Sequence, residues 1–338
     1  MADTALAQAT DVARALMGTA VEVDLIQTSG RNSRIWRVRT AERTFALKQY
    51  PPRSDDPRDR LSTEIGALRL MEKNRIEVVP RVLGVDAERG YALLSWIEGC
   101  DVATVGNHDI DAAVEFLAAI HRLRGTSWAA NQPLASEACL SGTEIECQVQ
   151  TRLARLSGLP QEPELSEFIE HSIRPAVIET ARAVREGVVT LGLDFVRELP
   201  QERRSLVPSD FGFHNSMRRT DGSLAFVDFE YFGWDDPVKL TADILLHPGQ
   251  ALLPRQRKRF RQAALRLYGG DRGFTDRLRV YLPLFGLRWV LILLNEFIPE
   301  RWQRRVLAGQ GGSWSETKAR QLSHAREFLA ALPEKLED

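Results

Sequence analysis

Short apolar runs alternate with turn-forming residues over the first hundred positions, a pattern typical of antiparallel strands. An alanine- and leucine-rich stretch predicts a helix over residues 4–18. Further on, apolar residues at helical spacing predict a helix from about Pro57 to Lys73, because proline is tolerated in the first helical turn. The strand-like runs around this second helix are 21–27, 34–40, 44–50, 78–85 and 91–96. We therefore expect a five-stranded antiparallel sheet with one helix inserted.

After Gly99 the apolar spacing changes from strand-like to helical. Helices are predicted over 110–123, from about 144 to 197 with a break at 158–163, and from Pro237 onwards. One β-hairpin is predicted inside this region, because Asp221-Gly222 lies between two short apolar runs. The predicted fold is α+β and bilobal. It has a small antiparallel β lobe over 1–94, a hinge at 95–99 and a large, mainly helical lobe over 100–338.

Composition and charge exclude several classes of protein. Lys+Arg number 45 and Asp+Glu number 46, so the excess positive charge of a general nucleic-acid binder is absent. The 3 cysteines are too few and too scattered for a disulfide framework or a zinc site. The most apolar stretch, Val280–Leu294, is too short to span a bilayer, and the first residues show no signal peptide. We expect a cytoplasmic protein with neither a nucleic-acid nor a membrane partner.

A buried ion pair is predicted in the first lobe. Lys48 lies inside an apolar strand, and Glu64 falls on the apolar stripe of the following helix. A carboxylate on a buried helix face is costly unless it is paired, and Lys48 is the nearest candidate partner. The alternatives are that Lys48 is an edge residue with its ammonium in water, and that Glu64 reaches solvent.

Polar residues at both ends of the predicted hairpin form a second candidate group. Asp210 and Asn215 flank a compact loop that leads into the hairpin, and Asp228 ends its second strand. The hairpin brings its two ends together, so an amide oxygen of Asn215 and a carboxylate of Asp228 would converge as Mg²⁺ ligands. Asp210 would then accept a proton from, or orient, an attacking hydroxyl. The alternative is that these are ordinary turn residues, because Asp and Asn are common in turns.

The order of these groups matches the parts needed for kinase-type phosphoryl transfer. At this point the sequence resembles the aminoglycoside phosphotransferase and choline kinase-like group of small-molecule kinases, which share the protein-kinase-like fold. The resemblance covers nearly the whole chain. The segments that carry it are 30–38, 45–48, 64–68, 94–99, 117–121, 209–215, 227–231 and 233–237.

The resemblance implies a role for each matching residue. Lys48 would hold the α- and β-phosphates, Glu64 would hold Lys48, and Asp210 would be the catalytic aspartate. Asn215 and Asp228 would carry Mg²⁺, and the nucleotide would be ATP, with GTP as the alternative. The loop residues covering the phosphates would be Ser29, Gly30, Asn32 and Ser33, and the backbone receiving the adenine would be that of Ser95, Trp96 and Ile97.

The phosphate acceptor is expected beside the catalytic loop and the helical insertions. The aromatic and acidic candidates are Tyr231, Trp234, Asp235, Glu296 and Trp302. Glu296 follows an apolar run and has an alternative interpretation as the solvated end of a helix. The helical tail is not notably acidic, which favours a neutral or anionic acceptor over a polycation. Sugars, aminoglycoside-like molecules and amino alcohols all remain candidates.

Two functional hypotheses follow. The first is an ATP- and Mg²⁺-dependent kinase that phosphorylates a hydroxyl of a small metabolite. The second is a nucleotide-binding pseudokinase or regulatory module, suggested by Pro208 at the position where the family usually has a histidine two residues before the catalytic aspartate. Retention of Lys48, Asp210, Asn215 and Asp228 favours the active enzyme. The acceptor and the oligomeric state stay open.

Overall fold

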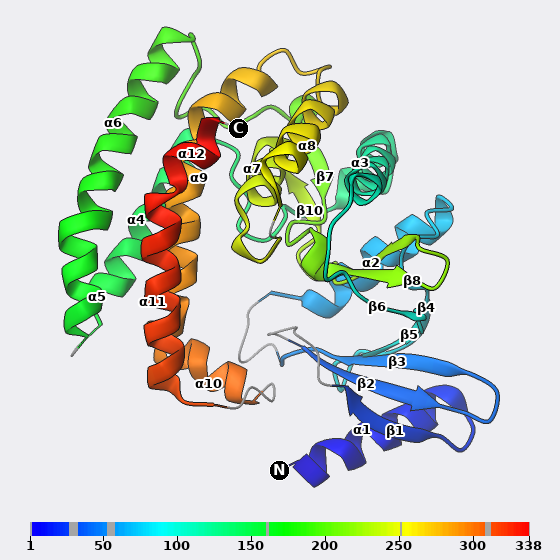
Figure 1. The fold of residues 1–338 in the computed structure, drawn as a ribbon. Coiled ribbons are helices and arrows are strands. Elements are labelled where there is room, and N and C mark those ends of the chain that lie inside the picture. Colours follow the sequence, from blue (N-terminus) through cyan, green and yellow to red (C-terminus); the bar gives the residue numbers. More distant parts are fainter. Residues whose placement is uncertain are drawn as a thin grey trace. The chain divides into compact units, whose positions relative to one another are not determined.

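The computed structural model describes residues 2–26, 33–52, 58–159, 162–250, 252–307 and 312–337, and Figure 1 draws its ribbon. The chain divides into two compact units. Unit 1 comprises Met1–Ala103, Pro208–Gly233 and Arg304–Gln310, and unit 2 comprises Thr104–Val207, Trp234–Gln303 and Gly311–Asp338. The hairpin segment of 208–233 therefore packs with the first hundred residues. The expected lobe boundaries at 94 and 100 stay a prediction.

Unit 1 contains the expected five-stranded antiparallel sheet, with the strand order β1-β2-β3-β5-β4. The strands are β1 (Glu22–Ile26), β2 (Arg34–Arg39), β3 (Thr44–Gln49), β4 (Val82–Asp86) and β5 (Tyr91–Ser95). Side chains alternate between the two faces of a strand, so Trp36, Val38 and Leu47 share one face. They pack with Ala9 and Val12 of α1 (Ala2–Met17), which covers that face.

The helix α2 (Arg60–Lys73) presents Glu64 on its buried side, together with Leu61, Ile65, Leu68 and Met71. It begins at Arg60, where the Asp59 carboxylate accepts a hydrogen bond from the Ser62 N–H at 3.1 Å. This cap satisfies one of the free N–H groups of the first turn. The predicted start at Pro57 lies outside the described residues. The apolar spacing thus identified the buried face of α2, and the N-cap fixes its start.

The predicted hairpin is present as β8 (Ser216–Arg219) and β9 (Leu224–Phe226), and β6 (Gly99–Asp101) pairs with β8 to complete a three-stranded sheet. Gly222 has φ 86° in the turn, a conformation that favours glycine. The hairpin is fixed to the segment after α2, because the Phe226 N–H donates to the Val78 carbonyl at 2.7 Å. The end of β9, which leads to Asp228, therefore lies beside the α2–β4 connection.

Unit 2 is mainly helical and is organised around α9 (Phe274–Leu293), which packs against α4, α6, α7 and α11 (Figure 1). The other α-helices among the described residues are α3 (Asn107–Arg122), α4 (Gly142–Ser157), α5 (Pro163–Phe168), α6 (Arg174–Thr190), α7 (Pro237–Leu246), α8 (Pro254–Leu267), α10 (Pro299–Leu307), α11 (Trp314–Ala330) and α12 (Leu332–Glu337). The strand β7 (Ser205–Val207) pairs with β10 (Gly233–Asp235). The α+β fold class is confirmed.

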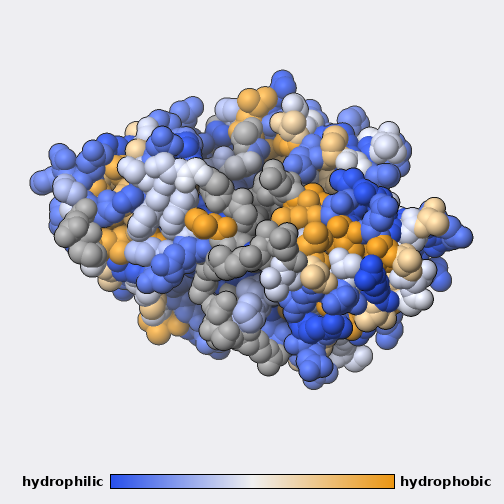
Figure 2. All heavy atoms as spheres, turned by 90° about the horizontal axis from the view of Figure 1, so that it is seen from below, coloured by the Kyte–Doolittle hydropathy of each residue, from blue (hydrophilic) through white to orange (hydrophobic). Residues whose placement is uncertain are grey.

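Among the described residues, one helical segment, Phe274–Phe297, is long and apolar enough to cross a membrane by length and composition alone. Within the protein, 72% of its most apolar window is buried, as in the core helix of a helical bundle. The face drawn in Figure 2 carries much hydrophilic surface, with hydrophobic residues in smaller groups. Scattered exposed hydrophobic side chains are normal on proteins and indicate no interaction site by themselves.

His121 on α3 gives a testable property of unit 2. Its Nδ1 lies 2.9 Å from the Ser205 hydroxyl, and its ring packs edge-on against Tyr268 with a centroid distance of 5.1 Å. Burial, together with the nearby Arg124, lowers the pKa of His121 from 6.5 to about 4. Folding therefore favours the neutral imidazole. This contribution to stability is complete above pH 6.5 and is lost as the pH falls through about 4.

We expect the free energy of unfolding to fall between pH 7 and pH 5 through this residue, by less than about 2 kcal/mol because the ring is only partly buried and solvent screens part of the effect. Urea unfolding at the two pH values measures the total change, and His121→Gln should show a correspondingly smaller one. An equal pH dependence in both proteins would contradict this assignment. An imidazole titration near pH 6.5, followed by NMR, would contradict it as well.

Candidate active site

A buried cluster of charges in unit 1 contains the predicted ion pair. Lys48 extends from β3, and its Nζ lies 2.5 Å from the Glu64 Oε2 and 2.6 Å from the Asp228 Oδ1. The Lys48 side chain is only 4% exposed and that of Glu64 only 2%. The alternatives of a solvated Lys48 and a solvated Glu64 are therefore wrong for this structure. One cation here joins a strand, a helix and the segment after the hairpin.

Glu64 is fixed by more than Lys48. Its Oε2 accepts a hydrogen bond from the Tyr50 hydroxyl at 2.8 Å, and its Oε1 accepts one from the Phe229 N–H at 3.2 Å. A buried carboxylate requires such partners, because each unsatisfied oxygen would lose its hydration without compensation. Glu64 therefore holds both the ammonium of Lys48 and the backbone next to Asp228.

The electrostatics of the cluster favour a charged lysine. Burial acts to lower the pKa of Lys48, but the carboxylates of Asp228 and Glu64 outweigh it and hold that pKa well above its usual value. Burial, reinforced by Asp228, raises the pKa of the Glu230 carboxyl. Lys48 is thus a permanent positive charge at this position, as binding of phosphate oxygens requires.

The loop before the hairpin presents Asp210 to solvent. The Asp210 side chain is 39% exposed, and its Oδ1 lies 3.2 Å from the His214 Nε2. Its backbone carbonyl accepts a hydrogen bond from the Asn215 side-chain amide at 2.8 Å. Ser209, immediately before it, has φ 66°, an unfavourable conformation for a residue other than glycine. The loop is therefore held in a strained shape around an accessible carboxylate.

Asp228 lies where β9 ends, and it shares the strained geometry. Its φ is 69°, and non-glycine residues with positive φ cluster at functional sites. The Val227 N–H donates to the Asn215 carbonyl at 3.0 Å, which joins the two ends of the hairpin as predicted. Asn215 and Asp228 are thus held in neighbouring segments, as a shared ligand would require.

The donor set at this position fits a hard divalent cation. Oxygens of Glu64, Asp228 and Glu230 lie within 4.8 Å of one another. Glu64 and Glu230 are enclosed in the cluster, whereas the Asp228 side chain is 29% exposed. The Asn215 amide donates through its nitrogen, which directs the amide oxygen elsewhere. The partly open Asp228 carboxylate suits Mg²⁺, which retains several water or phosphate ligands. The Asn215 amide oxygen would be the second protein ligand.

The residues expected to bind nucleotide are only partly described. Ser29, Gly30 and Asn32 lie outside the described residues. Ser33 is described, and its hydroxyl donates to the Glu230 Oε2 at 3.0 Å. That Ser29, Gly30, Asn32 and Ser33 cover the nucleotide phosphates stays a prediction.

The segment expected to receive adenine follows β5. The Ser95 N–H donates to the Arg81 carbonyl at 2.9 Å, so that donor is already engaged within the sheet. The Trp96 indole donates to Glu98 at 2.8 Å, and Ile97 is buried. Binding of adenine here stays a prediction, with the Trp96–Ile97 backbone as its remaining candidate contact.

The candidate acceptor residues fall in different surroundings. Tyr231 belongs to unit 1, half-buried beneath the guanidinium groups of Arg58 and Arg60, which lie 5.1 and 5.0 Å from its ring centroid. Trp302 stacks on Trp314 in unit 2, with ring centroids 6.3 Å apart. All of these residues remain predictions as substrate contacts.

Three acceptor candidates lie in the interior of unit 2. The Trp234 indole donates to the Ala129 carbonyl at 2.8 Å. Asp235 accepts from the Cys139 N–H at 2.8 Å and lies 3.5 Å from the Lys239 Nζ, and burial raises its pKa to about 6. Glu296 is 1% exposed, so it is not at a solvated helix end. In this structure these side chains face protein groups.

Sequence reasoning assigned no role to Tyr50, Arg60 or Glu230. Glu230 is completely buried, lies 3.6 Å from the Lys48 Nζ and accepts a hydrogen bond from the Arg60 guanidinium. Glu230 lies only two residues after Asp228 in the sequence, but Asp228 has φ 69° and Glu230 lies in a turn, so strand periodicity gave no signal for its position. Nothing in the local pattern indicates the partner on α2, which is 170 residues away in sequence.

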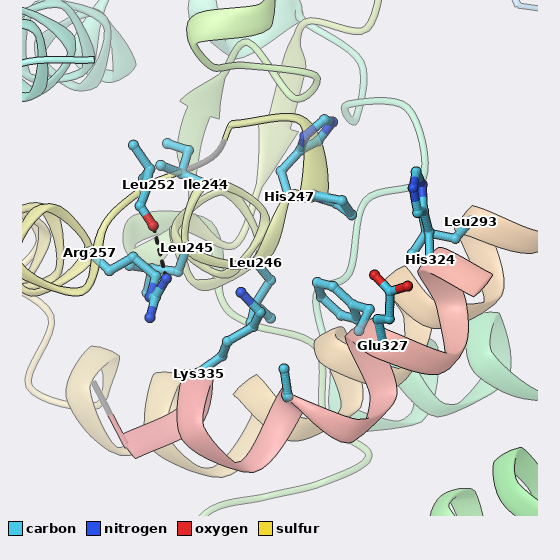
Figure 3. A pocket seen from close by; sticks show the side chains of 13 residues that line it. Ile244, Leu245, Leu246, His247, Leu252, Arg257, Leu293, His324, Glu327 and Lys335 are labelled. Carbon is cyan, nitrogen blue, oxygen red and sulfur yellow. Dashed lines mark hydrogen bonds between the residues drawn. The ribbon is translucent and has the colours of Figure 1, made fainter. Parts of the chain in front are cut away.

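Unit 2 also contains a cavity of about 370 Å³ between the end of α7 and the helices α11 and α12 (Figure 3). The polar side chains on its wall include His247, Arg257, His324, Glu327 and Lys335, among leucines and other apolar residues. None of the residues predicted from the sequence to act in catalysis or binding lines it.

The sequence model of the phosphotransferase enzyme family matches residues 26–277, and the chain belongs to this family. No curated protein matches the chain at a significant level. The matched region includes Lys48, Glu64, Asp210, Asn215 and Asp228. The expected enzyme class, a phosphotransferase, is confirmed at the level of the family.

Several solved structures of kinases and phosphotransferases have a similar fold. A spectinomycin phosphotransferase, solved with ADP and spectinomycin, is similar with a TM-score of 0.66 at 12% identity, covering 97% of this chain and 98% of that one. A choline kinase from Streptococcus pneumoniae has a TM-score of 0.59 at 16% identity, covering 95% and 98%. A choline/ethanolamine kinase family protein from Mesorhizobium loti has a TM-score of 0.54 at 18% identity, covering 97% and 98%. At such identities the likeness establishes the fold.

Proposed function

We propose that this protein is an ATP- and Mg²⁺-dependent kinase that transfers the γ-phosphoryl group to a hydroxyl of a small metabolite. The observation that carries the proposal is the position of Lys48 between Glu64 and Asp228, with the accessible carboxylate of Asp210 in the same unit. Phosphoryl transfer by kinases uses a lysine that is held by a glutamate on a helix. It also uses two further acidic residues at separate positions, here Asp210 and Asp228.

Each residue has a physical task in this reaction. Lys48 binds phosphate oxygens with a charge that burial does not remove. Asp210 orients the acceptor hydroxyl and takes its proton as the new O–P bond forms and the bond to the leaving ADP breaks. Asn215 and Asp228 would hold Mg²⁺, which supplies charge neutralisation at the phosphates when bound. The transition state of this reaction is stabilised mainly by the positions and charges of the surrounding groups. The strained backbone at Ser209 and Asp228 holds the catalytic carboxylates in place before the substrates bind.

The acceptor is proposed to be a small hydroxylated molecule. Proteins of similar fold include a choline kinase, an ethanolamine kinase and a spectinomycin phosphotransferase. Amino alcohols, aminoglycoside-like compounds and sugars are therefore the compounds to test first. A cytoplasmic location, where ATP is available, is part of the proposal.

Nucleotide binding can be tested before the acceptor is known. Thermal unfolding should be followed with ATP or GTP, each with and without Mg²⁺, because a ligand that binds only the folded state raises the unfolding temperature. We expect a rise with ATP that is larger with Mg²⁺, and loss of the Mg²⁺-dependent part in Asp228→Asn. Mg²⁺ without nucleotide is the control. Absence of any shift at millimolar nucleotide would contradict the proposed function.

A further inference from the structure

Glu230 is the most enclosed carboxylate of the charge cluster, with a side-chain exposure of 0%. Its Oε2 accepts a hydrogen bond from the Ser33 hydroxyl at 3.0 Å and lies 3.6 Å from the Lys48 Nζ. Its Oε1 accepts from the Arg60 guanidinium. A buried carboxylate is tolerated only when it is paired with a cation or a hydrogen-bond donor. The position of the Glu230 carboxylate therefore depends on these neighbours.

Arg60 occupies a position that α2 itself does not favour. It is the first residue of the helix, where the helix dipole is positive and a cation is disfavoured. Arginine is also rarely buried unless it is paired, yet Arg60 is 4% exposed. Its contacts with Glu230 and with the ring of Tyr231, 5.0 Å away, account for its place. Arg60 is therefore positioned for the cluster at the expense of helix energetics.

The charges of the cluster compete for Lys48. Its Nζ lies within 3.6 Å of carboxylate oxygens of Glu64, Asp228 and Glu230. Of these three, Glu230 is the one that Arg60 also contacts. Without Arg60, the Glu230 carboxylate would still have the Lys48 ammonium 3.6 Å away. Attraction between opposite charges at such distances is strong where few water molecules screen it. Lys48 would then be held more tightly by carboxylates.

We propose that Arg60 is a positioning residue, which holds the Glu230 carboxylate at the start of α2 and so leaves the Lys48 ammonium available for nucleotide phosphates. This inference rests on the proposed function, because it requires that Lys48 binds a nucleotide. It adds Arg60, which lies outside the catalytic loop and the hairpin, to the residues on which nucleotide binding depends. It also gives a reason for a buried arginine to which the sequence analysis assigned no role.

Calorimetric titration with ADP in the presence of EDTA tests the inference without Mg²⁺ and without turnover. We expect Arg60→Met to weaken ADP binding at least tenfold and Arg60→Lys to weaken it less. Arg69→Met is the matched control, because it removes an exposed positive charge from the same helix, and it should bind within twofold of the wild type. Circular dichroism establishes that each variant is folded. Wild-type affinity in a folded Arg60→Met protein would overturn the inference.

A second arm separates positioning from a purely structural role. In a Glu230→Gln background the Glu230 charge no longer competes for Lys48, and the contacts of Lys48 with Glu64 and Asp228 are unchanged. Adding Arg60→Met to that background should therefore leave ADP affinity within twofold. A tenfold loss in that background would overturn the inference, as would failure of Glu230→Gln itself to bind ADP. This comparison also serves if Arg60→Met alone does not fold. Failure of the wild type to bind ADP would instead contradict the proposed function.

Discussion

Replacing Asp210 by asparagine should lower acceptor-dependent ADP release by about 10²- to 10⁴-fold, the usual contribution of a positioned general base. The asparagine has nearly the same size but cannot take the proton of the acceptor hydroxyl. Because the Asp210 side chain is 39% exposed, the fold should tolerate the change. The backbone carbonyl that accepts from Asn215 is retained. The unfolding temperature should therefore stay close to that of the wild type.

The control for this experiment is Asp101→Asn, which changes an exposed aspartate of the same unit. A coupled assay of ADP release with an acceptor found by screening gives the rate. The ADP affinity of Asp210→Asn should remain within a few-fold of the wild type, because the proton is transferred only in the chemical step. Undiminished turnover in Asp210→Asn would remove Asp210 from the proposed mechanism.

Local patterns in the sequence predicted most of the fold and the centre of the candidate site. The strands over 34–40 and 44–50 and the turn at Asp221-Gly222 are determined by residues that are neighbours in the sequence. The spacing of apolar residues therefore predicts such elements directly. The contact of Lys48 with Glu64 joins positions only 16 residues apart, and helical spacing was enough to place Glu64 on the buried face.

Contacts between distant segments were not predictable in this way. The pairing of Arg60 with Glu230 spans 170 residues, and no local periodicity encodes it. Asp235 was predicted to contact the acceptor as one of the acidic candidates, and its position beside Lys239 in the interior of unit 2 was not indicated by the local pattern. The helical pattern shows that a residue is near an apolar stripe but not which partner faces it. The packing of 208–233 with the first hundred residues also depends on tertiary contacts.

The cluster makes a second prediction of large size. Lys48→Met should abolish nucleotide binding and lower the free energy of unfolding by about 3–5 kcal/mol, because it leaves the buried Glu64 carboxylate without its cation. The Tyr50 hydroxyl and the Phe229 N–H still donate to Glu64, but neither carries a charge. Urea unfolding measures the loss, and Lys73→Met, at the exposed end of α2, is the matched control.

The double variant Lys48→Met with Glu64→Leu separates stability from function. Replacing both members of a buried ion pair by apolar side chains is often neutral, so part of the lost unfolding free energy should return. The rest should not, because Asp228 still lacks the Lys48 cation and two buried donors, the Tyr50 hydroxyl and the Phe229 N–H, lose their acceptor. Nucleotide binding should not return, because the methionine offers phosphate no positive charge. Lys48 and Glu64 would then be retained for ligand binding rather than for stability. Recovery of nucleotide binding in the double variant, or equal instability of the single and double variants, would contradict this interpretation.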